Sequence, residues 1–412
     1  MDTSYLPRLI RDRVVESLAD TPVVCLLGPR QVGKTTLAQR IDSERAYLNL
    51  DDPTLLAAAQ QDPLGFIESL PERSTLDEVQ RAPELLLAIK SMVDRDRQPG
   101  RLLLTGSANL LLLPQAQESL AGRMEVIYLH PLAEQEKRVS ESTLLTKLIT
   151  GQLAAKLVPD HRPLPATPET ICQGGYPEPN RRTPRRARQW YRQYLNAIIQ
   201  RDVKDIAAIQ DEDGMLRLME LLAYRTASLL NVSTLSKELG LERGTVTKYL
   251  SILERLFLIR QLPAWHRNQA KRLIKSPKLH LVDTGLAAAL GRLSFDQWLT
   301  EAERFGALLE THVVEQLMAQ ASWVEPELRF SHYRDKDQVE VDLIIERGQA
   351  LWGVEVKRSA TVQSKDAAGL ARLAAQAGQQ FQGGMLIYTG RHCVKLNVPG
   401  CFAVPISMLW GE

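Results

Sequence analysis

The stretch that decides the fold is residues 28–35, which read Gly28-Pro29-Arg30-Gln31-Val32-Gly33-Lys34-Thr35. It fits the pattern GxxxxGK[ST], with an apolar segment (TPVVCLL) before it and a helical one (TLAQRI) after it. In this strand–loop–helix context, main-chain N–H groups curl around an anionic phosphate at a helix N-terminus, where the helix dipole favours negative charge. The stretch therefore predicts a phosphate-binding loop on a parallel α/β sheet, rather than a Gly-rich turn with only a structural role.

We expect the loop to bind ATP or ADP together with Mg²⁺. Lys34 would reach the β- and γ-phosphates and take part in catalysis, and the Thr35 hydroxyl would ligate the metal. The predicted nucleotide contacts in this segment are Gly28, Pro29, Arg30, Gln31, Val32, Gly33, Lys34, Thr35 and Thr36.

Two adjacent acids, Asp77 and Glu78, stand at the end of the predicted strand Ser74–Asp77. Asp77 is predicted to hold Mg²⁺, and Glu78 is predicted to orient or activate the attacking water. Acids also favour the start of any helix, so a solvated helix start is the alternative. A later segment, LLLTGS, places Thr105 and Ser107 at a strand end, where ligands of parallel sheets bind, and either could sense the γ-phosphate.

Arg123 is a candidate catalytic arginine, because an arginine near the γ-phosphate offsets developing charge. It could act within its own chain or on a neighbouring subunit, which leaves oligomerisation open. A surface salt bridge is the alternative explanation.

Short apolar runs alternate with helical stretches through the first third of the chain, as βα units do. Because the runs are continuous rather than alternating, we expect strands covered by helices on both faces. The candidate strands are Val23–Leu27, Ala46–Leu50, Ser74–Asp77, Leu102–Thr105 and Val126–Leu129.

Composition narrows the class of protein. The 412 residues carry 51 Lys and Arg and 49 Asp and Glu, a net charge of +2, so a nucleic-acid surface would have to be local. The four cysteines are scattered, and the histidines form no HxxxH pair, which argues against disulfides and a histidine-built zinc site. Without an apolar span of about 18 residues, we expect a soluble cytoplasmic protein that makes no membrane contact.

The segments GPRQVGKTT, LDEVQ, LLLTGSA and SLAGRMEVIYLHPLAEQE together resemble the N-terminal core of a large prokaryotic family of AAA-superfamily ATPases. The similarity spans roughly residues 5–137. It implies ATP binding, ATP hydrolysis and a P-loop fold with an additional strand between the two nucleotide-binding strands. GGYPE (residues 174–178), YLNAIIQRDVKDI and KSPKLHLVDTGL resemble the companion C-terminal domain of that family, which has no assigned function.

Residues 228–262 predict a helix-turn-helix. Ser233 is predicted to cap one helix, Gly240 breaks it, and a second helix runs from about Gly244 to Arg255, followed by the first strand of a wing. Thr245, Thr247 and Lys248 stand where a recognition helix meets DNA. Residues 181–192 and 267–278 are basic and contain no acid, which is typical of a phosphodiester partner. A packing module without DNA is the alternative.

Acidic residues near the C-terminus suggest a second chemical site. Residues 339–345 and 352–357 predict a hairpin that brings Asp342 to the same face as Glu355 and Lys357, and an upstream helix could add Glu310. This order resembles the PD-(D/E)XK nuclease-like fold, although Val341 replaces the proline that names the motif. The resemblance implies Mg²⁺ on the carboxylates and phosphodiester cleavage, or else an inactive relic.

We therefore predict an α/β protein with four segments. These are an AAA-type ATPase core (1–137), a helical linker or lid (138–205), a winged helix-turn-helix (206–265) and an α/β restriction-endonuclease-like domain (266–412). The predicted function is that of an Mg²⁺-dependent ATPase acting on, or regulated by, DNA. The alternative is a nucleotide-dependent switch that binds a protein partner and carries an inactive nuclease-like domain.

Overall fold

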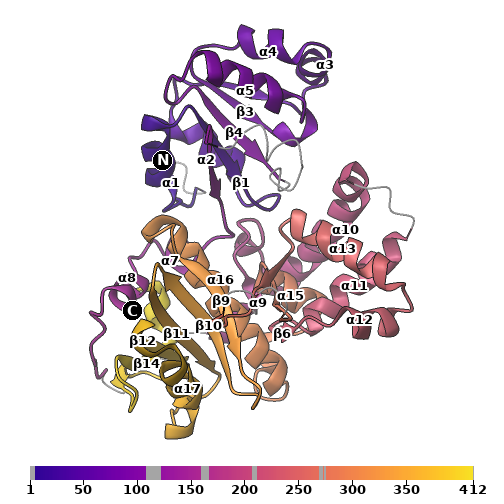
Figure 1. Cartoon of the computed structure of the whole chain (residues 1–412). Coiled ribbons are helices and arrows are strands. Elements are labelled where there is room, and N and C mark those ends of the chain that lie inside the picture. The colour runs from indigo at the N-terminus through magenta and orange to yellow at the C-terminus, as the bar shows by residue number, and fades with distance from the viewer. Residues whose placement is uncertain are drawn as a thin grey trace. The chain divides into compact units, whose positions relative to one another are not determined.

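The computed structural model describes residues 5–107, 122–158, 167–206, 211–268, 272 and 275–411 of the chain. Contacts divide the chain into two compact units (Figure 1). One comprises residues 1–132 with 255–257, and the other comprises residues 133–254 and 258–412. The first unit ends at Leu132, and the three later predicted segments fall almost entirely within the second unit.

A five-stranded parallel sheet forms the centre of the first unit, in the order β2-β3-β4-β1-β5. β4 lies between β1 and β3, which is the additional strand that the family resemblance implied. The five predicted strands are confirmed to within two residues at their ends. The elements are α1 (Arg11–Asp20), β1 (Val23–Leu27), α2 (Lys34–Ile41), β2 (Ala46–Asn49), α3 (Pro53–Gln61), α4 (Pro63–Ser69), β3 (Ser74–Asp77), α5 (Leu85–Arg95), β4 (Leu102–Gly106) and β5 (Met124–Tyr128).

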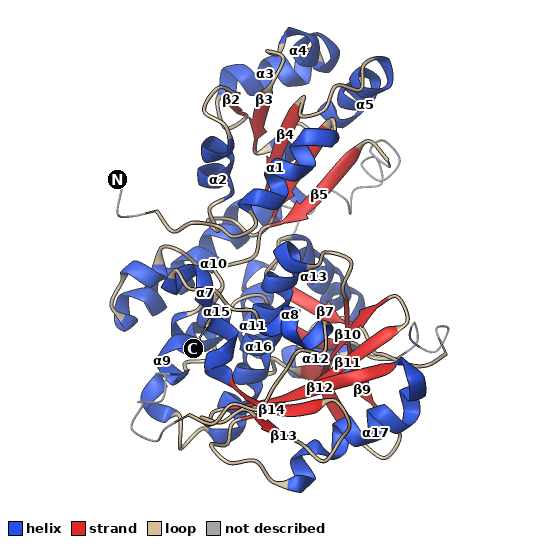
Figure 2. Ribbon diagram, turned by 90° about the vertical axis from the view of Figure 1, so that its left-hand side faces the viewer, coloured by secondary structure: helices blue, strands red, loops and turns tan. Residues whose placement is uncertain are grey.

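Helices flank this sheet, as Figure 2 shows. Val23, Cys25 and Leu27 of β1 pack in one apolar core with residues of α3, α4 and α5. The intervening Val24 and Leu26 are also buried, and successive strand side chains point to opposite faces. β1, an interior strand of the sheet, is apolar throughout because both of its faces are covered. This arrangement places the loop after β1 at the carboxyl edge of the sheet.

The second unit contains two further sheets. One is three-stranded and antiparallel in the order β6-β8-β7, and the other is six-stranded in the order β13-β14-β12-β11-β10-β9. The strands are β6 (Ser228–Leu229), β7 (Ile259–Leu262), β8 (Lys278–Leu281), β9 (Arg329–Arg334), β10 (Glu340–Arg347), β11 (Ala350–Lys357), β12 (Phe381–Tyr388), β13 (Val394–Lys395) and β14 (Cys401–Pro405).

Helices make up much of the rest of the second unit. They are α7 (Glu134–Arg138), α8 (Leu144–Ile149), α9 (Thr167–Gln173), α10 (Pro184–Ile206), α11 (Glu212–Tyr224), α12 (Val232–Leu239), α13 (Arg243–Arg255), α15 (Thr284–Leu290), α16 (Ala302–Val324) and α17 (Ala368–Ala377). Within the described ranges, none of the helices is both long and apolar enough to cross a membrane.

An aromatic and polar junction fixes α15 in the second unit. Asp283 accepts the N–H of Leu286 at 2.8 Å, which caps α15, and its other oxygen accepts the N–H of Gly175 at 2.6 Å. Tyr176 donates to or accepts from the Tyr194 hydroxyl on α10 at 2.9 Å. Because these groups are buried and satisfied by one another, the Gly-Gly-Tyr-Pro and Asp-Thr-Gly segments have a structural explanation.

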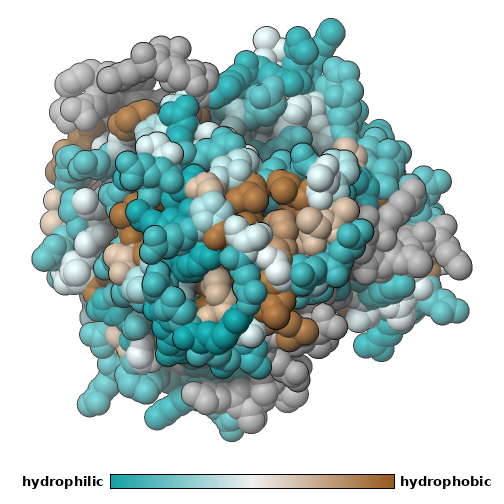
Figure 3. Space-filling model, turned by 90° about the horizontal axis from the view of Figure 1, so that it is seen from above, coloured by the Kyte–Doolittle hydropathy of each residue, from teal (hydrophilic) through white to brown (hydrophobic). Residues whose placement is uncertain are grey.

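The surface seen in Figure 3 is predominantly hydrophilic, and the hydrophobic residues on that face form separate small groups. Individual exposed apolar side chains, such as Leu64, Leu87 and Leu299, lie far apart in the sequence. Single exposed apolar residues are ordinary on folded proteins and carry no functional implication by themselves.

Candidate functional site

At two positions, the glycine-rich loop after β1 has a backbone conformation that side chains other than glycine rarely adopt. Gly28 has φ 157°, and a Cβ on it would lie 2.3 Å from the carbonyl oxygen of Leu129. Gly33 has φ 98° and is the N-cap of α2. The loop is further held by Arg8, whose guanidinium donates to the carbonyl oxygens of Val32 at 2.8 Å and His130 at 2.7 Å. The loop is thus fixed against the end of β5 with its amides at the start of a helix.

Lys34, the first residue of α2, is buried within this loop. Its ammonium group donates to the carbonyl oxygens of Gly28 at 2.9 Å and Pro29 at 2.8 Å. A bound triphosphate would compete with these carbonyls for the ammonium, because charge-assisted bonds to phosphate are stronger than bonds to neutral carbonyls.

The other residues predicted for this loop follow its path. Pro29 and Val32 are buried, Gln31 and Thr36 are exposed, and Arg30 is half-buried. Gln31 has φ 62°, which is uncommon for a non-glycine residue and belongs to a tight loop.

Three hydroxyl groups converge on the carboxylate of Asp77, the last residue of β3. The Thr35 hydroxyl donates to Oδ2 at 2.8 Å, the Tyr47 hydroxyl of β2 donates to the same oxygen, and the Thr105 hydroxyl of β4 donates to Oδ1. Asp77 is only 2% exposed. Burial and the Asp77 carboxylate raise the pKa of Tyr47, so this hydroxyl stays a proton donor.

Glu78 belongs to a second, smaller network beside Asp77. It has φ 59°, and its carboxylate accepts from the Ser107 hydroxyl at 3.1 Å and from the Gln80 amide. The Gln80 amide also donates to the Ser107 hydroxyl at 2.9 Å. A left-handed conformation at a bulky residue is sparsely populated, and such conformations cluster at functional sites. Lys34 lies just after the loop that follows β1, and Asp77 and Glu78 lie at the end of β3. The structure thus brings all three residues to the carboxyl edge of the sheet.

This donor set fits a magnesium ion bound with a nucleotide. Mg²⁺ prefers carboxylate and hydroxyl oxygens, and it usually binds through one or two protein groups plus substrate phosphates. Thr35 and Asp77 supply one hydroxyl and one carboxylate in direct contact. These are the residues that would hold the ion.

Arg123 does not lie at this site. It precedes Met124, which pairs with Val23 at the amino end of β1, whereas the loop follows the carboxyl end of β1. The length of β1 alone separates these two edges by about 13 Å. Arg123 instead forms an ion pair with Asp94 of α5, with Nε and Nη2 at 2.6 and 3.0 Å from the two carboxylate oxygens. The predicted role of Arg123 within its own chain is therefore wrong, because the turn into β5 starts at the opposite edge.

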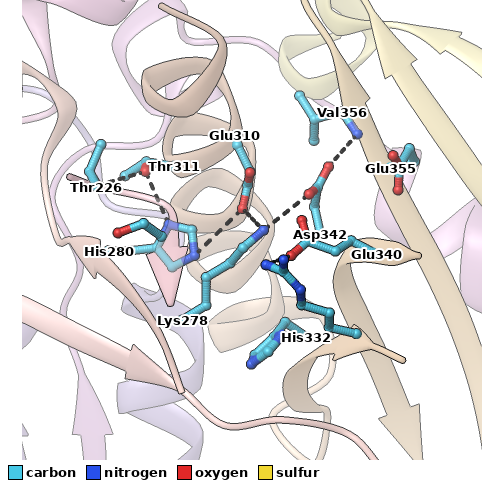
Figure 4. A network of polar contacts seen from close by, with 12 residues as sticks. Thr226, Lys278, His280, Glu310, Thr311, His332, Glu340, Asp342, Glu355 and Val356 are labelled. Carbon is cyan, nitrogen blue, oxygen red and sulfur yellow. Dashed lines mark hydrogen bonds and ion pairs between the residues drawn. The ribbon is translucent and has the colours of Figure 1, made fainter. Parts of the chain in front are cut away.

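The acids near the C-terminus lie around a lysine that the sequence analysis did not single out (Figure 4). Asp342 of β10 and Glu310 of α16 contact the Lys278 ammonium at 3.1 and 2.7 Å. The second oxygen of Asp342 accepts the main-chain N–H of Val356 at 2.9 Å. These contacts are buried, and they join β8 to the six-stranded sheet.

Glu355 of β11 lies close to this group, as the hairpin prediction required. Its Oε1 accepts from the Lys357 ammonium at 2.7 Å. Burial, together with the Asp342 carboxylate, raises the pKa of Glu355 to about 8. The predicted hairpin of β10 and β11 is present as an antiparallel pair.

The predicted second metal site does not fit these contacts. No cluster of three His, Cys, Asp or Glu side chains with metal-binding geometry occurs in the part of the chain that the structure describes. Glu310, Asp342, Glu355 and Lys357 are near one another, but Lys278 supplies the cation that joins the first two. The sequence predicted a divalent ion on these carboxylates, but in the structure Glu310 and Asp342 contact a lysine instead.

The predicted helix pair is present as α12 and α13, and Gly240 ends α12 with φ 66°. Thr247 and Lys248 are exposed on α13, whereas Thr245 is half-buried. The Thr247 hydroxyl donates to the carbonyl oxygen of Arg243 at 3.0 Å, so its proton is used within the helix. Part of the basic segment 267–278 lies outside the described residues.

Comparison with known families agrees with the geometry of the first unit. Residues 20–137 match the AAA domain family. Residues 165–297 and 305–409 match two domains of unknown function, DUF8612 and DUF4143. The parallel sheet, the glycine-rich loop and this match define the first unit as the P-loop ATPase domain of an AAA-superfamily protein.

The chain is 30% identical over 355 residues to the uncharacterized protein Rv2008c of Mycobacterium tuberculosis. The alignment covers 85% of this chain and 73% of the relative. The uncharacterized protein Mb2031c of Mycobacterium bovis matches with the same identity and coverage. The chain therefore belongs to the family of these two mycobacterial proteins.

Solved structures with partial similarity include the Walker-type ATPase PABY2304 of Pyrococcus abyssi, which is 17% identical with a TM-score of 0.39. That alignment covers 68% of this chain and 94% of the other. The RuvB Holliday junction branch migration motor of Thermotoga maritima is 19% identical with a TM-score of 0.31, covering 62% and 89%.

Sequence reasoning missed three residues of these sites: Tyr47, Gln80 and Lys278. Tyr47 is the second residue of β2, the strand next to β3, and a hydroxyl-bearing side chain within that strand was the available signal. Lys278 was visible as a charged residue at the start of the apolar run LHLV. Nothing in the sequence indicates that its partners would be Glu310 and Asp342.

Proposed function

We propose that this chain hydrolyses ATP with magnesium at the carboxyl edge of the parallel sheet. The observation that carries the proposal is the contact between the Thr35 hydroxyl and the Asp77 carboxylate beside the Lys34 loop. Thr35 directly follows the loop after β1, and Asp77 ends β3, which β4 separates from β1 in the sheet. This arrangement supports phosphate and metal together.

Each residue has a defined part in this reaction. The loop amides and the Lys34 ammonium bind the β- and γ-phosphates and offset the charge that develops during transfer. A magnesium ion, when bound by Thr35 and Asp77, supplies further charge neutralisation on the phosphate oxygens. Glu78 accepts a hydrogen bond from the attacking water and orients it, and the bonds from Gln80 and Ser107 hold the Glu78 carboxylate in place.

The test is ATP turnover by the full-length chain in magnesium. We expect Lys34→Ala to lower turnover at least about 100-fold, and Glu78→Gln to lower it at least about 10-fold while ATP binding is retained. Lys90→Ala and Glu72→Gln are the matched controls on the same unit and should leave turnover unchanged. Normal turnover in both site variants would contradict the proposal. Tight nucleotide binding without turnover in the wild type would favour the switch function instead.

Double-stranded DNA is the partner that the second unit supports best. The helices α12 and α13 are joined by a short turn at Gly240 and are followed by the antiparallel strands β7 and β8, as in a winged helix-turn-helix. The exposed position of Lys248 on α13 suits a phosphate contact, and the acid-free segment 181–192 begins just before α10 and runs into its first turns.

Salt dependence separates DNA binding from a packing role. We expect DNA to stimulate ATP turnover at 50 mM salt and to lose this effect at 200 mM salt, because phosphate contacts release condensed counterions. Lys248→Ala should weaken DNA binding alike for unrelated sequences, with Lys237→Ala on α12 as the matched control. DNA that neither binds nor changes turnover at 50 mM salt would leave the helix pair as a packing module.

The order of elements around β10 and β11 supports a nuclease-like ancestry for the C-terminal part. α16 precedes the antiparallel strands β9, β10 and β11, and α17 then leads to β12, which is parallel to β11. Asp342 and Glu355 lie on adjacent strands of this meander. The contacts of Lys278 bear on whether such a domain cleaves anything.

A further inference from the structure

A lysine lies among the carboxylates of the nuclease-like segment. Lys278 is the first residue of β8, where all four strand residues are buried, and Lys278 itself is 3% exposed. A lysine is almost never buried this deeply without a charged partner. β8 also belongs to a different sheet from β10 and β11. Lys278 therefore requires an explanation beyond the packing of β8.

The Lys278 ammonium bridges two carboxylates from two further elements. It lies 2.7 Å from Glu310 Oε1 on α16 and 3.1 Å from Asp342 Oδ1 on β10, as Figure 4 shows. The remaining oxygen of Asp342 is occupied by the N–H of Val356. Both oxygens of the acid that would lead a nuclease metal site are thus engaged within the chain.

Charge in this cluster is balanced by lysines. Burial alone would remove the charge of Lys278, but the Asp342 and Glu310 carboxylates outweigh burial and raise the pKa of Lys278. Glu355 has its own cation in Lys357 at 2.7 Å. The neighbouring His280 and His332 are held uncharged, since burial and Lys278 lower the pKa of each. Lys278 therefore contacts Glu310 and Asp342, and Lys357 contacts Glu355, so each of these acids meets a cation of the chain itself.

We propose that the Lys278 ammonium is a built-in counter-ion that takes the place of a divalent metal between Glu310 and Asp342. A divalent ion at these carboxylates would have to displace a buried ammonium or sit beside it against like-charge repulsion. The nuclease-like segment is then a scaffold that excludes the metal, and it does not cleave phosphodiesters by metal-assisted hydrolysis. This inference is independent of the proposed ATPase activity.

Manganese binding to the full-length chain tests the proposal without measuring ATP turnover. Mn²⁺ is titrated by calorimetry in the absence of nucleotide, and all chains carry Asp77→Asn to remove the metal ligand of the first unit. We expect Lys278→Met to bind one Mn²⁺ at least 10-fold more tightly than the chain that retains Lys278. Adding Asp342→Asn to Lys278→Met should abolish that gain, and Lys275→Met is the matched lysine control, which should gain nothing.

The chain that retains Lys278 supplies a second measurement, which does not depend on whether Lys278→Met folds. Mn²⁺ binding to that chain should be the same with and without Asp342→Asn, and Mg²⁺ should not support DNA nicking. An Asp342-dependent Mn²⁺ site or Asp342-dependent nicking in the presence of Lys278 would overturn the proposal. A folded Lys278→Met chain that gains no site would overturn it as well.

Discussion

Replacing Glu355 by glutamine should stabilise the second unit at high pH. Glu355 is 6% exposed, and its Oε2 is buried without a hydrogen-bond partner. Burial, followed by the Asp342 carboxylate, raises its pKa from 4.5 to about 8. The folded chain therefore holds a proton on Glu355 at neutral pH, whereas the unfolded chain has lost it.

The direction of the pH effect follows from this difference in proton binding. Because the folded state binds the proton more tightly, stability falls as pH rises above about 4.5 and continues to fall until about pH 8. At 1.36 kcal/mol for each pKa unit, the full cost of ionising Glu355 is roughly 5 kcal/mol at most. Glutamine removes this cost but weakens the bond from Lys357, which is worth about 1.5–3 kcal/mol. We expect Glu355→Gln to be more stable than the wild type by about 2 kcal/mol at pH 9, and within about 1 kcal/mol of it at pH 4.5.

Tryptophan fluorescence during urea denaturation measures this effect in the right unit. All six tryptophans lie between residues 190 and 410, so the signal reports the second unit only. Unfolding midpoints at pH 4.5 and pH 9 are compared for the wild type, Glu355→Gln and the exposed control Glu303→Gln. The control should show no pH-dependent difference from the wild type. A wild type that matches or exceeds Glu355→Gln at pH 9 would refute the reasoning.

Three further predictions follow from the contacts of the two units. Tyr47→Phe removes a hydrogen bond to Asp77, so the Mg²⁺ concentration for half-maximal ATP turnover should rise about 10-fold; an unchanged magnesium dependence would show that Tyr47 does not position Asp77. Lys278→Met leaves Glu310 and Asp342 buried without their cation and should cost the second unit about 3–5 kcal/mol at pH 8 without added metal, measured by tryptophan fluorescence; a loss below 1 kcal/mol would contradict the buried ion pair. Arg123→Ala should leave the turnover of dilute protein unchanged, since Arg123 lies at the far edge of the sheet; a loss that appears only at high protein concentration would instead indicate action on a neighbouring subunit.

The core of the first unit follows closely from local sequence. The five predicted strands agree with β1 to β5, most clearly at β1 and β4, which are short apolar runs bounded by polar residues, Gly or Pro and are buried throughout. The hairpin of β10 and β11 was also predictable, since its turn and its alternating residues lie within one continuous segment.

The positions of isolated charged residues did not follow from the sequence. Arg123 stands next to a predicted strand, but whether it reaches the phosphates depends on which end of that strand it precedes in the folded sheet. The contacts of α7 also have no local signal, because α7 packs with residues near the C-terminus, and Ser140, just after α7, donates to the carbonyl oxygen of Trp410 at 2.5 Å. Such contacts join parts of the chain that are far apart.

The sequence by itself determined the phosphate-binding loop, because its ligands are consecutive main-chain amides with one lysine and one threonine, all set by a single strand–loop–helix segment. Only the tertiary structure decided which cation meets the C-terminal acids. Lys278, Glu310 and Asp342 come from a strand, a helix and a second sheet, and the burial that makes their charges interact strongly exists only once these elements have packed together.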